Sequence, residues 1–302
     1  MENQSTIKHN ISISGKGLHS GKNVSLLFQP AAADHGIVFR RTDLPGKPFV
    51  KAHVDNVYDT SRGTSLKENE AEVKTVEHVM AALAALSIDN VLIDIDAEET
   101  PIMDGSARLY VEALQKAETV LQDEPRRYIR PDKEIRFKKK DAGIEISILP
   151  ADDFKMEVFV DYGTPVLSEQ YAVLESMDHF IPEIYASRTF VFLHELQFLI
   201  AHNLVKGGDI DNAIVFVDKK PDQKILDELA AFFNKRDIDV TENGTLDHIQ
   251  LRHVNEPARH KLLDLVGDLY LLGRPVKGHI KAVRPGHFAN TEFAKLILEE
   301  LF

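Results

Sequence analysis

The chain has 302 residues, of which 36 are Lys or Arg and 48 are Asp or Glu, and its formal net charge is −12. This acidic balance argues against nucleic-acid binding, because phosphates are neutralised by basic surfaces. The sequence contains no cysteine. That excludes disulfides, thiolate metal sites and cysteine nucleophiles, so any metal ion must be held by His, Asp or Glu.

The length allows one large domain or two of ordinary size. No segment has the roughly 20 consecutive apolar residues that a membrane-spanning helix needs. Residues 1–10 are polar and lack the apolar core of a secretory signal. We therefore expect a cytoplasmic protein that is monomeric and does not insert stably into a membrane.

The first half of the chain begins with a strand pattern and ends in helix, strand and helix. Alternating apolar residues predict strands at 11–13, 24–28, 36–39 and 49–54. The spacing then predicts a helix over 74–85, a strand at 90–95, and a second helix through Val111, Leu114 and Val120. Residues 122–134 hold two prolines and many charges, a composition typical of a linker.

The second half repeats this order. Strands are predicted at 135–137, 144–148, 156–160, 212–217 and 278–283, and helices at 193–202, 224–234, 256–272 and 291–301. Each sheet must cover one apolar face. The sequence therefore predicts an α+β fold of two similar domains, residues 1–127 and 128–302. Each would be a β-sheet packed on two helices, with the helices sandwiched between the sheets.

The predicted helix at 256–272 carries the strongest chemical signal. His260, Asp264 and Asp268 are spaced by four residues, which places an imidazole and two carboxylates on one helix face. One interpretation is a surface helix with incidental charges. The other is a metal site, because a histidine and an aspartate one turn apart can reach the same cation. In that case Asp268, from outside the ligand group, would orient a histidine.

Glu77 and His78 are the candidates to complete such a site, since they lie in an otherwise apolar helix. The alternative is a partly exposed start of that helix. Adjacent helical residues point about 100° apart, so one can bind the metal while the other acts as general base on its water. His194 and Glu195 begin like the zinc-protease motif, but Phe198 replaces its second histidine, and we reject that motif.

A series of short motifs runs along nearly the whole chain. They are GLHSG at 17–21, TVEH at 75–78, PIMDGS at 101–106, SRTF at 187–190, GG at 207–208, DNAIV at 211–215, RHK at 259–261 with Asp264, GD at 267–268 and GH at 286–287. In this order they resemble the UDP-3-O-acyl-N-acetylglucosamine deacetylases, the zinc amidases of bacterial lipid A synthesis. The resemblance implies two similar α+β domains with a small insert in each.

The resemblance also implies the metal site and the base. By this match zinc is held by His78, His260 and Asp264. Glu77 is then the general base that acts on water at the metal. Iron(II) also suits a site of two histidines and one carboxylate.

Four further roles follow from the same match. Thr189 stabilises the oxyanion together with the metal. His287 is the electrostatic or general-acid partner of the leaving amine, and Asp268 holds that histidine charged. Lys261 contacts the substrate.

The implied substrate is UDP-3-O-(3-hydroxyacyl)-N-acetylglucosamine, whose N-acetyl group is hydrolysed to the free amine and acetate. Its acyl chain is expected in an insert at about residues 193–217. Apolar residues are available there to line a tunnel, with ordinary core packing as the alternative for each: Phe192, Leu196, Leu199, Ile200, Leu204, Ile210 and Ala213. Phe190 and Gly208 are assigned to substrate binding, and Tyr162 matches an aromatic position near the uridine.

Two alternatives stay open. One is a catalytically silent sugar-binding relative on the same fold, although Glu77, Thr189 and His287 are all present. The other is an amidase for a different N-acetyl sugar. The loop at 59–66 departs from some relatives, because it carries Arg62 and none of their cysteines.

Overall fold

A computed structural model describes residues 2–209, 212–242, 244–246 and 249–302. Within these ranges the chain is a mixed α+β structure with several sheets and seven α-helices. In the same ranges, no helix combines the length and the apolar character needed to cross a bilayer.

Two five-stranded sheets share one topology. The first has the order β2 (Ile11–Lys16), β3 (Asn23–Pro30), β9 (Val91–Ile95), β4 (Ile37–Arg41) and β5 (Phe49–Lys51). The second has the order β11 (Ile135–Lys139), β12 (Ile144–Leu149), β17 (Gly278–Val283), β13 (Phe154–Asp161) and β14 (Glu169–Leu174). In each, the central strand is antiparallel to one neighbour and parallel to the other. This equivalence agrees with the repeated order of elements in the sequence.

The alternation of the sequence explains why each sheet has one apolar face. In β3 the side chains of Val24, Leu26 and Phe28 are buried, while their neighbours are more exposed. In β13, Met156 and Val158 are buried in the same way. Successive side chains of a strand point to opposite faces, so these residues form one surface that helices must cover.

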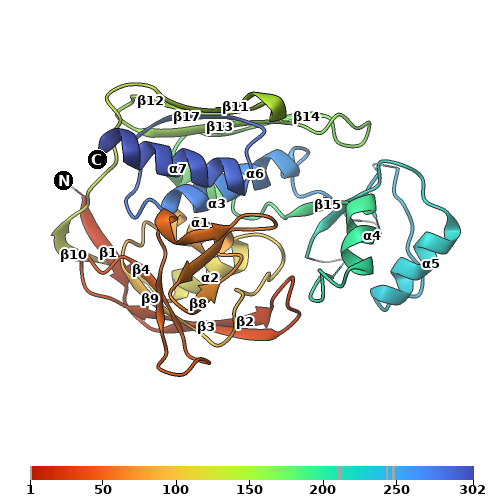
Figure 1. Ribbon diagram of the computed structural model, residues 1–302, viewed down its shortest axis with the longest axis horizontal. Coiled ribbons are helices and arrows are strands. Elements are labelled where there is room, and N and C mark those ends of the chain that lie inside the picture. Colours follow the sequence, from red (N-terminus) through yellow and green to blue (C-terminus); the bar gives the residue numbers. More distant parts are fainter. Residues whose placement is uncertain (1, 210–211, 243, 247–248) are drawn as a thin grey trace.

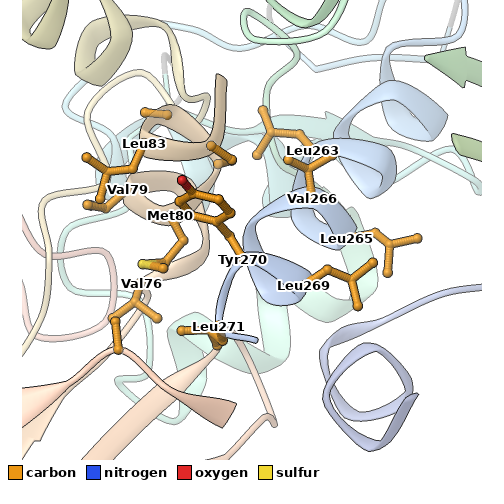
Figure 2. Packing of buried hydrophobic residues seen from close by; sticks show 14 of the residues in the cluster. Val76, Val79, Met80, Leu83, Leu263, Leu265, Val266, Leu269, Tyr270 and Leu271 are labelled. Carbon is orange, nitrogen blue, oxygen red and sulfur yellow. The ribbon is translucent and has the colours of Figure 1, made fainter. Parts of the chain in front are cut away.

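Four helices lie between the two sheets in Figure 1. They are α1 (Glu77–Ala85), α2 (Arg108–Lys116), α6 (Glu256–Tyr270) and α7 (His287–Leu301). Figure 2 shows how apolar side chains of α1 and α6 pack against each other. Both helices are buried over most of their length.

The backbones of α1 and α6 come very close at Gly267. A Cβ atom added there would lie 2.1 Å from the carbonyl oxygen of Glu77. No residue with a side chain fits at that distance, so glycine allows the close crossing. The crossing brings the start of α1 next to the middle of α6.

The smaller elements lie outside the two five-stranded sheets and the four helices between them. β1 (Asn3–Ile7) pairs with β10 (Thr119–Pro125), and β6 (Val57–Asp59), β7 (Ser65–Glu68) and β8 (Ala71–Val73) form a three-stranded sheet. β15 (Phe190–Phe192), α4 (Leu193–Ala201), β16 (Ile214–Phe216) and α5 (Gln223–Phe232) lie together at one end of the molecule (Figure 1). The short helices are α3 (Phe180–Glu183) and the 3₁₀ turns Val54–Asn56, Lys140–Ala142 and Met177–His179.

Three sequence predictions were wrong in detail. Val120 does not extend the helix α2, because that helix ends at Lys116 and Glu118 turns the chain with a φ of 55°. The start of the predicted linker at 122–134 continues strand β10, where Pro125 pairs with Asn3. The last helix begins at His287, four residues before the predicted start.

Candidate metal centre and active site

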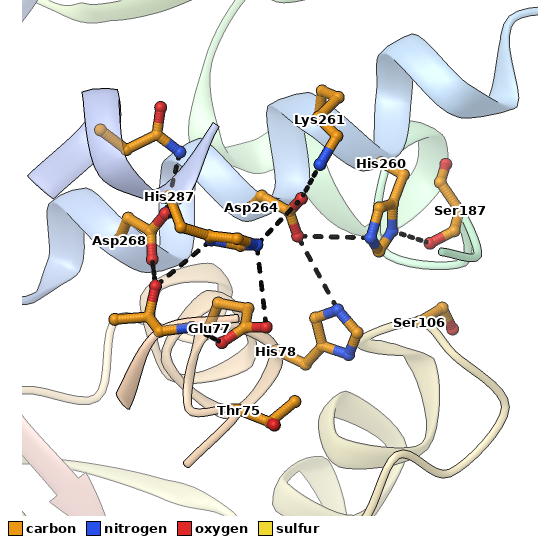
Figure 3. A network of polar contacts seen from close by, with 12 residues as sticks. Thr75, Glu77, His78, Ser106, Ser187, His260, Lys261, Asp264, Asp268 and His287 are labelled. Carbon is orange, nitrogen blue, oxygen red and sulfur yellow. Dashed lines mark hydrogen bonds and ion pairs between the residues drawn. The ribbon is translucent and has the colours of Figure 1, made fainter. Parts of the chain in front are cut away.

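Helices α1 and α6 each supply part of one buried polar group (Figure 3). Ligand-type atoms of His78, His260 and Asp264 all lie within 4.8 Å of one another, and all three residues are buried. Asp264 Oδ1 lies 3.3 Å from His260 Nε2 and 3.8 Å from His78 Nε2. The structure therefore brings together the three residues that the sequence suggested as metal ligands.

The unpaired atoms of this group fit a metal ion. Among the described residues, Asp264 Oδ1 and His78 Nδ1 are buried and have no hydrogen-bond partner. A buried polar atom without a partner is unfavourable, and a cation would give the carboxylate oxygen one. His260 Nδ1 lies 3.0 Å from the carbonyl oxygen of Ser187, which leaves Nε2 free toward Asp264. This is how an outer contact orients a metal-binding histidine.

The protonation states also suit a cation. Burial, together with the nearby His260, lowers the pKa of His78 to about 3, and burial lowers the pKa of His260 as well. Both imidazoles are therefore neutral, as metal ligands must be. Burial alone would raise the pKa of the Asp264 carboxyl, but the positive charges of Lys261 and His287 hold it far below its usual range.

Glu77 is a buried carboxylate beside the ligand group. Its Oε2 accepts a hydrogen bond of 2.8 Å from the backbone N–H of Thr64. Its Oε1 lies 4.0 Å from His287 Nε2. Burial raises the pKa of Glu77 to about 7. A carboxylate with this pKa can exchange a proton near neutral pH, which is the requirement for a general base.

His287 begins α7 and faces three carboxylates. Its Nδ1 lies 2.9 Å from Asp268 Oδ2, and its Nε2 lies 3.8 Å from Asp264 Oδ2. Burial alone would lower the pKa of this imidazole, but Asp268, Asp264 and Glu77 together raise it to about 9. His287 is thus protonated at neutral pH, with Nε2 directed toward the metal-ligand group.

A cavity of about 770 Å³ adjoins this group. Its wall includes the charged residues Glu77, Asp264, Lys261 and His287. The apolar part of the wall comes from the region of α4, β15 and β16 and from two loops of the first half: Leu18, Ile102, Phe190, Val191, Leu196, Phe198, Leu199, Val205, Ala213, Val215 and Phe233. An apolar compartment therefore continues directly from the polar group.

Two glycine motifs of the sequence meet at the wall of this cavity. The backbone N–H of Gly207 donates to the carbonyl oxygen of Leu18 at 2.9 Å. A Cβ atom on Gly207 would lie 2.0 Å from the carbonyl oxygen of Gly17. The loops at 17–21 and 207–208 therefore need glycine because their backbones touch.

The model of the family described as UDP-3-O-acyl N-acetylglycosamine deacetylase matches residues 4–230 and 234–299. The chain belongs to this family. The resemblance that the sequence motifs indicated is thereby confirmed.

Individual relatives agree with the family match. A "UDP-3-O-acyl-N-acetylglucosamine deacetylase" of Pseudomonas entomophila is 37% identical over 303 residues, covering 99% of this chain and 91% of the relative. A protein of the same name from Teredinibacter turnerae is 38% identical over 302 residues, with the same coverage. A "Bifunctional enzyme LpxC/FabZ" of Bacteroides thetaiotaomicron is 44% identical over 301 residues, and this chain spans 65% of its length.

The structure places most residues that the family resemblance singled out around the cavity. Thr189, Phe190, Leu196, Leu199, Gly208, Ala213 and Lys261 line it. Lys261 Nζ lies 2.9 Å from Asp264 Oδ2 and 5.8 Å from the centre of the Phe190 ring.

Four residues expected at the substrate are not brought to the cavity. Among the described residues that line it, Phe192, Ile200, Leu204 and Tyr162 are missing. The Tyr162 ring instead packs edge-on against Phe190, at 5.4 Å between ring centres. Phe192 and Ile200 pack within apolar clusters. Ile210 lies outside the described residues.

Sequence reasoning missed Thr64 and Asn290. Thr64 Oγ1 donates to Asp268 Oδ1 at 2.5 Å, and Asn290 Nδ2 donates to Asp268 Oδ2 at 2.8 Å. Asn290 lies one turn after the start of α7, on the side of the helix that carries His287, so helical spacing could have indicated it. Thr64 lies in an irregular loop that offers no such signal.

Proposed function

We propose that this chain hydrolyses the N-acetyl group of UDP-3-O-(3-hydroxyacyl)-N-acetylglucosamine, a step of lipid A biosynthesis. The products are acetate and the free amine. Family membership supports the reaction. The observation that carries the proposal for this chain is the buried group of His78, His260 and Asp264 beside an apolar cavity.

We infer that these three residues hold a zinc ion. Two neutral imidazoles and one carboxylate form a typical catalytic zinc donor set, and iron(II) suits the same set. When bound, the ion supplies a Lewis acid that polarises the amide carbonyl and activates water. Measurement of the metal content decides between the two ions.

Glu77 and His287 divide the proton transfers. Glu77 removes a proton from the water that attacks the amide carbon, which its pKa near 7 allows. His287, protonated at neutral pH, gives a proton to the amide nitrogen as the carbon–nitrogen bond breaks. Asp268 holds His287 charged through the contact of 2.9 Å at Nδ1.

The remaining predicted residues have substrate roles in this proposal. Thr189 lines the cavity and is proposed to donate a hydrogen bond to the oxyanion. Lys261 and Phe190 are proposed to contact the sugar, with Leu196 and Gly208 along the acyl chain. The role of Tyr162 near the uridine stays a prediction.

The same proposal extends to the architecture. We propose two domains, residues 1–127 and 128–302, because the two sheets share one strand order and each is followed by a helix of the central layer. The insert of the first is β6–β8, and that of the second includes α4, β16 and α5. Monomeric state and cytoplasmic location stay predictions.

The decisive experiment measures two quantities on one purified sample. Release of acetate from the acylated UDP-sugar and about one bound metal ion per chain are expected, as for other single catalytic sites. Chelation should abolish turnover, and added zinc should restore it. A folded, metal-loaded protein that leaves the acylated substrate intact would instead support the silent binding relative. Equal turnover of a sugar without the acyl chain would support an amidase of different specificity.

A further inference from the structure

Thr64 is buried between the Glu77 carboxylate and the pair formed by Asp268 and His287. It lies just before β7, and its side chain is 0% exposed. Its backbone N–H donates to Glu77 Oε2 at 2.8 Å, and its hydroxyl donates to Asp268 Oδ1 at 2.5 Å. One residue therefore contacts both carboxylates that serve the proton transfers, one from α1 and one from α6.

The loop that carries Thr64 is fixed to the start of α1. The backbone N–H of Val76 donates to the carbonyl oxygen of Thr64 at 3.1 Å. The preceding Gly63 has a φ of 158°, and a Cβ atom there would lie 2.8 Å from Glu77 Oε1. The loop thus lies directly against the Glu77 carboxylate, and glycine gives it room.

The hydroxyl of Thr64 completes the contacts of a fully buried carboxylate. Asp268 is 0% exposed. Its Oδ2 receives His287 Nδ1 at 2.9 Å and Asn290 Nδ2 at 2.8 Å, so the contact from Thr64 is at the other oxygen, Oδ1. With both oxygens held, the plane of the carboxylate cannot rotate away from the imidazole.

The Thr64 hydroxyl has one proton, so it can donate a hydrogen bond to only one of its two neighbours. Thr64 Oγ1 also lies 3.2 Å from His287 Nδ1. A hydroxyl can donate once and accept at its lone pairs, while an ionised carboxylate only accepts. The hydroxyl therefore donates to Asp268 and turns a lone pair toward the protonated ring.

We propose that Thr64 is a positioning residue that sets the placement of the Asp268–His287 pair relative to Glu77. This inference rests on the proposed function, because the pair serves the leaving amine there. Thr64 does not touch the reacting atoms and acts through Asp268 and Glu77.

The test replaces Thr64 by valine and by serine. Thr64→Val keeps the shape but removes the hydroxyl, whereas Thr64→Ser keeps the hydroxyl. Loss of a hydrogen-bond partner of this kind lowers activity by about 10- to 100-fold. We expect that loss in kcat for Thr64→Val, with KM and metal content close to wild type, and a kcat near wild type for Thr64→Ser. Thr6→Val is the control, since Thr6 is a buried hydrogen-bonded threonine on β1.

A double variant separates positioning from general destabilisation. If the hydroxyl acts through Asp268, Thr64→Val should cause no further loss of kcat in an Asp268→Ala background. A wild-type kcat for Thr64→Val would overturn the proposal. So would a serine variant as impaired as the valine variant, or equal losses with and without Asp268. Should Thr64→Val not fold, Thr64→Ala removes the same hydroxyl and leaves no methyl group against the Asp268 carboxylate.

A crystal structure gives a readout that does not depend on turnover. In Thr64→Val, the Asp268 carboxylate is expected to rotate and lose its contact with His287 Nδ1. Unchanged positions of Asp268 and His287 would overturn the proposal even if the wild type is inactive. An inactive wild type with a rotated carboxylate in the variant would reject only the proposed function.

Discussion

At the scale of single residues, burial and neighbouring charges set the protonation states of the site. Glu77 is buried and His287 is partly buried at the cavity wall, and the pKa of the first is raised to about 7 and that of the second to about 9. The carboxyl is raised chiefly by burial, whereas the imidazole is raised by the carboxylates around it in spite of burial. Near neutral pH, the arrangement therefore offers a proton acceptor and a proton donor side by side.

Replacement of Glu77 should lower turnover but leave metal binding unchanged. Glu77 is not one of the three proposed ligands, so Glu77→Ala is expected to keep its metal. Loss of a general base lowers the rate by about 100- to 10,000-fold. Metal content and kcat measured on the same preparation check this. Full activity of Glu77→Ala would remove the base from the mechanism, and loss of the metal would make Glu77 part of the metal site.

The pH dependence of kcat/KM should be bell-shaped. As pH falls, Glu77 takes up a proton and can no longer act as base, which gives the acid limb. Its pKa of about 7 belongs to the metal-free group, and a cation nearby lowers it, so that limb should lie at or below pH 7. As pH rises, His287 loses its proton, which gives the basic limb; because a bound cation would lower this pKa too, that limb should lie at or below pH 9. In His287→Ala the basic limb should vanish, and an unchanged basic limb would contradict the assignment.

At the scale of elements, the site is positioned by the crossing of α1 and α6. The crossing depends on backbone contact, because Gly267 has no side chain and lies against the carbonyl of Glu77. The separation of His78 from Asp264 is therefore set by main-chain atoms rather than by adjustable side chains. A change of one methyl group at this point acts directly on the metal-ligand distances.

Gly267→Ala should disrupt the metal group without touching a ligand. The added Cβ would meet backbone, which cannot yield as a flexible side chain does, so the helices must separate. Overpacking of this kind costs about 1–3 kcal/mol. A lower Tm and a weaker metal affinity are expected. At Gly286 an added Cβ meets nothing within 4 Å, so Gly286→Ala should keep its metal affinity. Equal metal affinity in the two variants would show that the crossing does not set the site.

Some elements could be predicted from the sequence and others could not. The central strands alternate because one face of each sheet is more buried than the other, and α1 and α6 could be predicted because apolar residues recur at helical spacing along both. The ribbon of β1 and β10 gave no such signal, since β10 is largely exposed and Leu121 is 76% exposed. The short strands β6–β8 have three or four residues each. That is too few for a period to be read.

The same limit applies to the site. His260, Asp264 and Asp268 share one helix, so their spacing placed them on one face. His78 was a candidate because it lies in an otherwise apolar helix, the family resemblance implied its role as a ligand, and the structure brings it next to His260 and Asp264. Thr64 is separated from Asp268 by 204 positions. It comes from a loop whose course depends on tertiary contacts, which no local pattern encodes.

At the scale of the whole molecule, the proposed ligand group draws on the helices that precede the central strands of the two five-stranded sheets. One proposed ligand comes from the helix before β9, and two come from the helix before β17. The same strand order stands on each side. The acidic net charge of −12 describes the average surface, whereas Arg62, Lys261 and His287 lie at the cavity, where an anionic substrate would bind.

Metal removal should lower the stability of the folded chain. An ion that binds only the folded state stabilises it by about 2.7 kcal/mol when its free concentration is a hundred times the Kd. Thermal unfolding with and without chelator should therefore differ in Tm, and the difference should grow with added zinc. His78→Ala should lose this metal dependence. A Tm that stays the same with chelator and with added zinc would contradict metal binding at this group.

Because the chain has no cysteine, the ligand group could also take the structural role that a disulfide has in other proteins. No disulfide can join the two halves of this chain, but an ion held by His78 on one helix and by His260 and Asp264 on the other would act as a reversible cross-link between them. Unlike a disulfide, such a cross-link forms under reducing conditions and opens when the ion is withdrawn. The supply of metal would then govern how firmly the halves are fastened as well as whether the reaction runs.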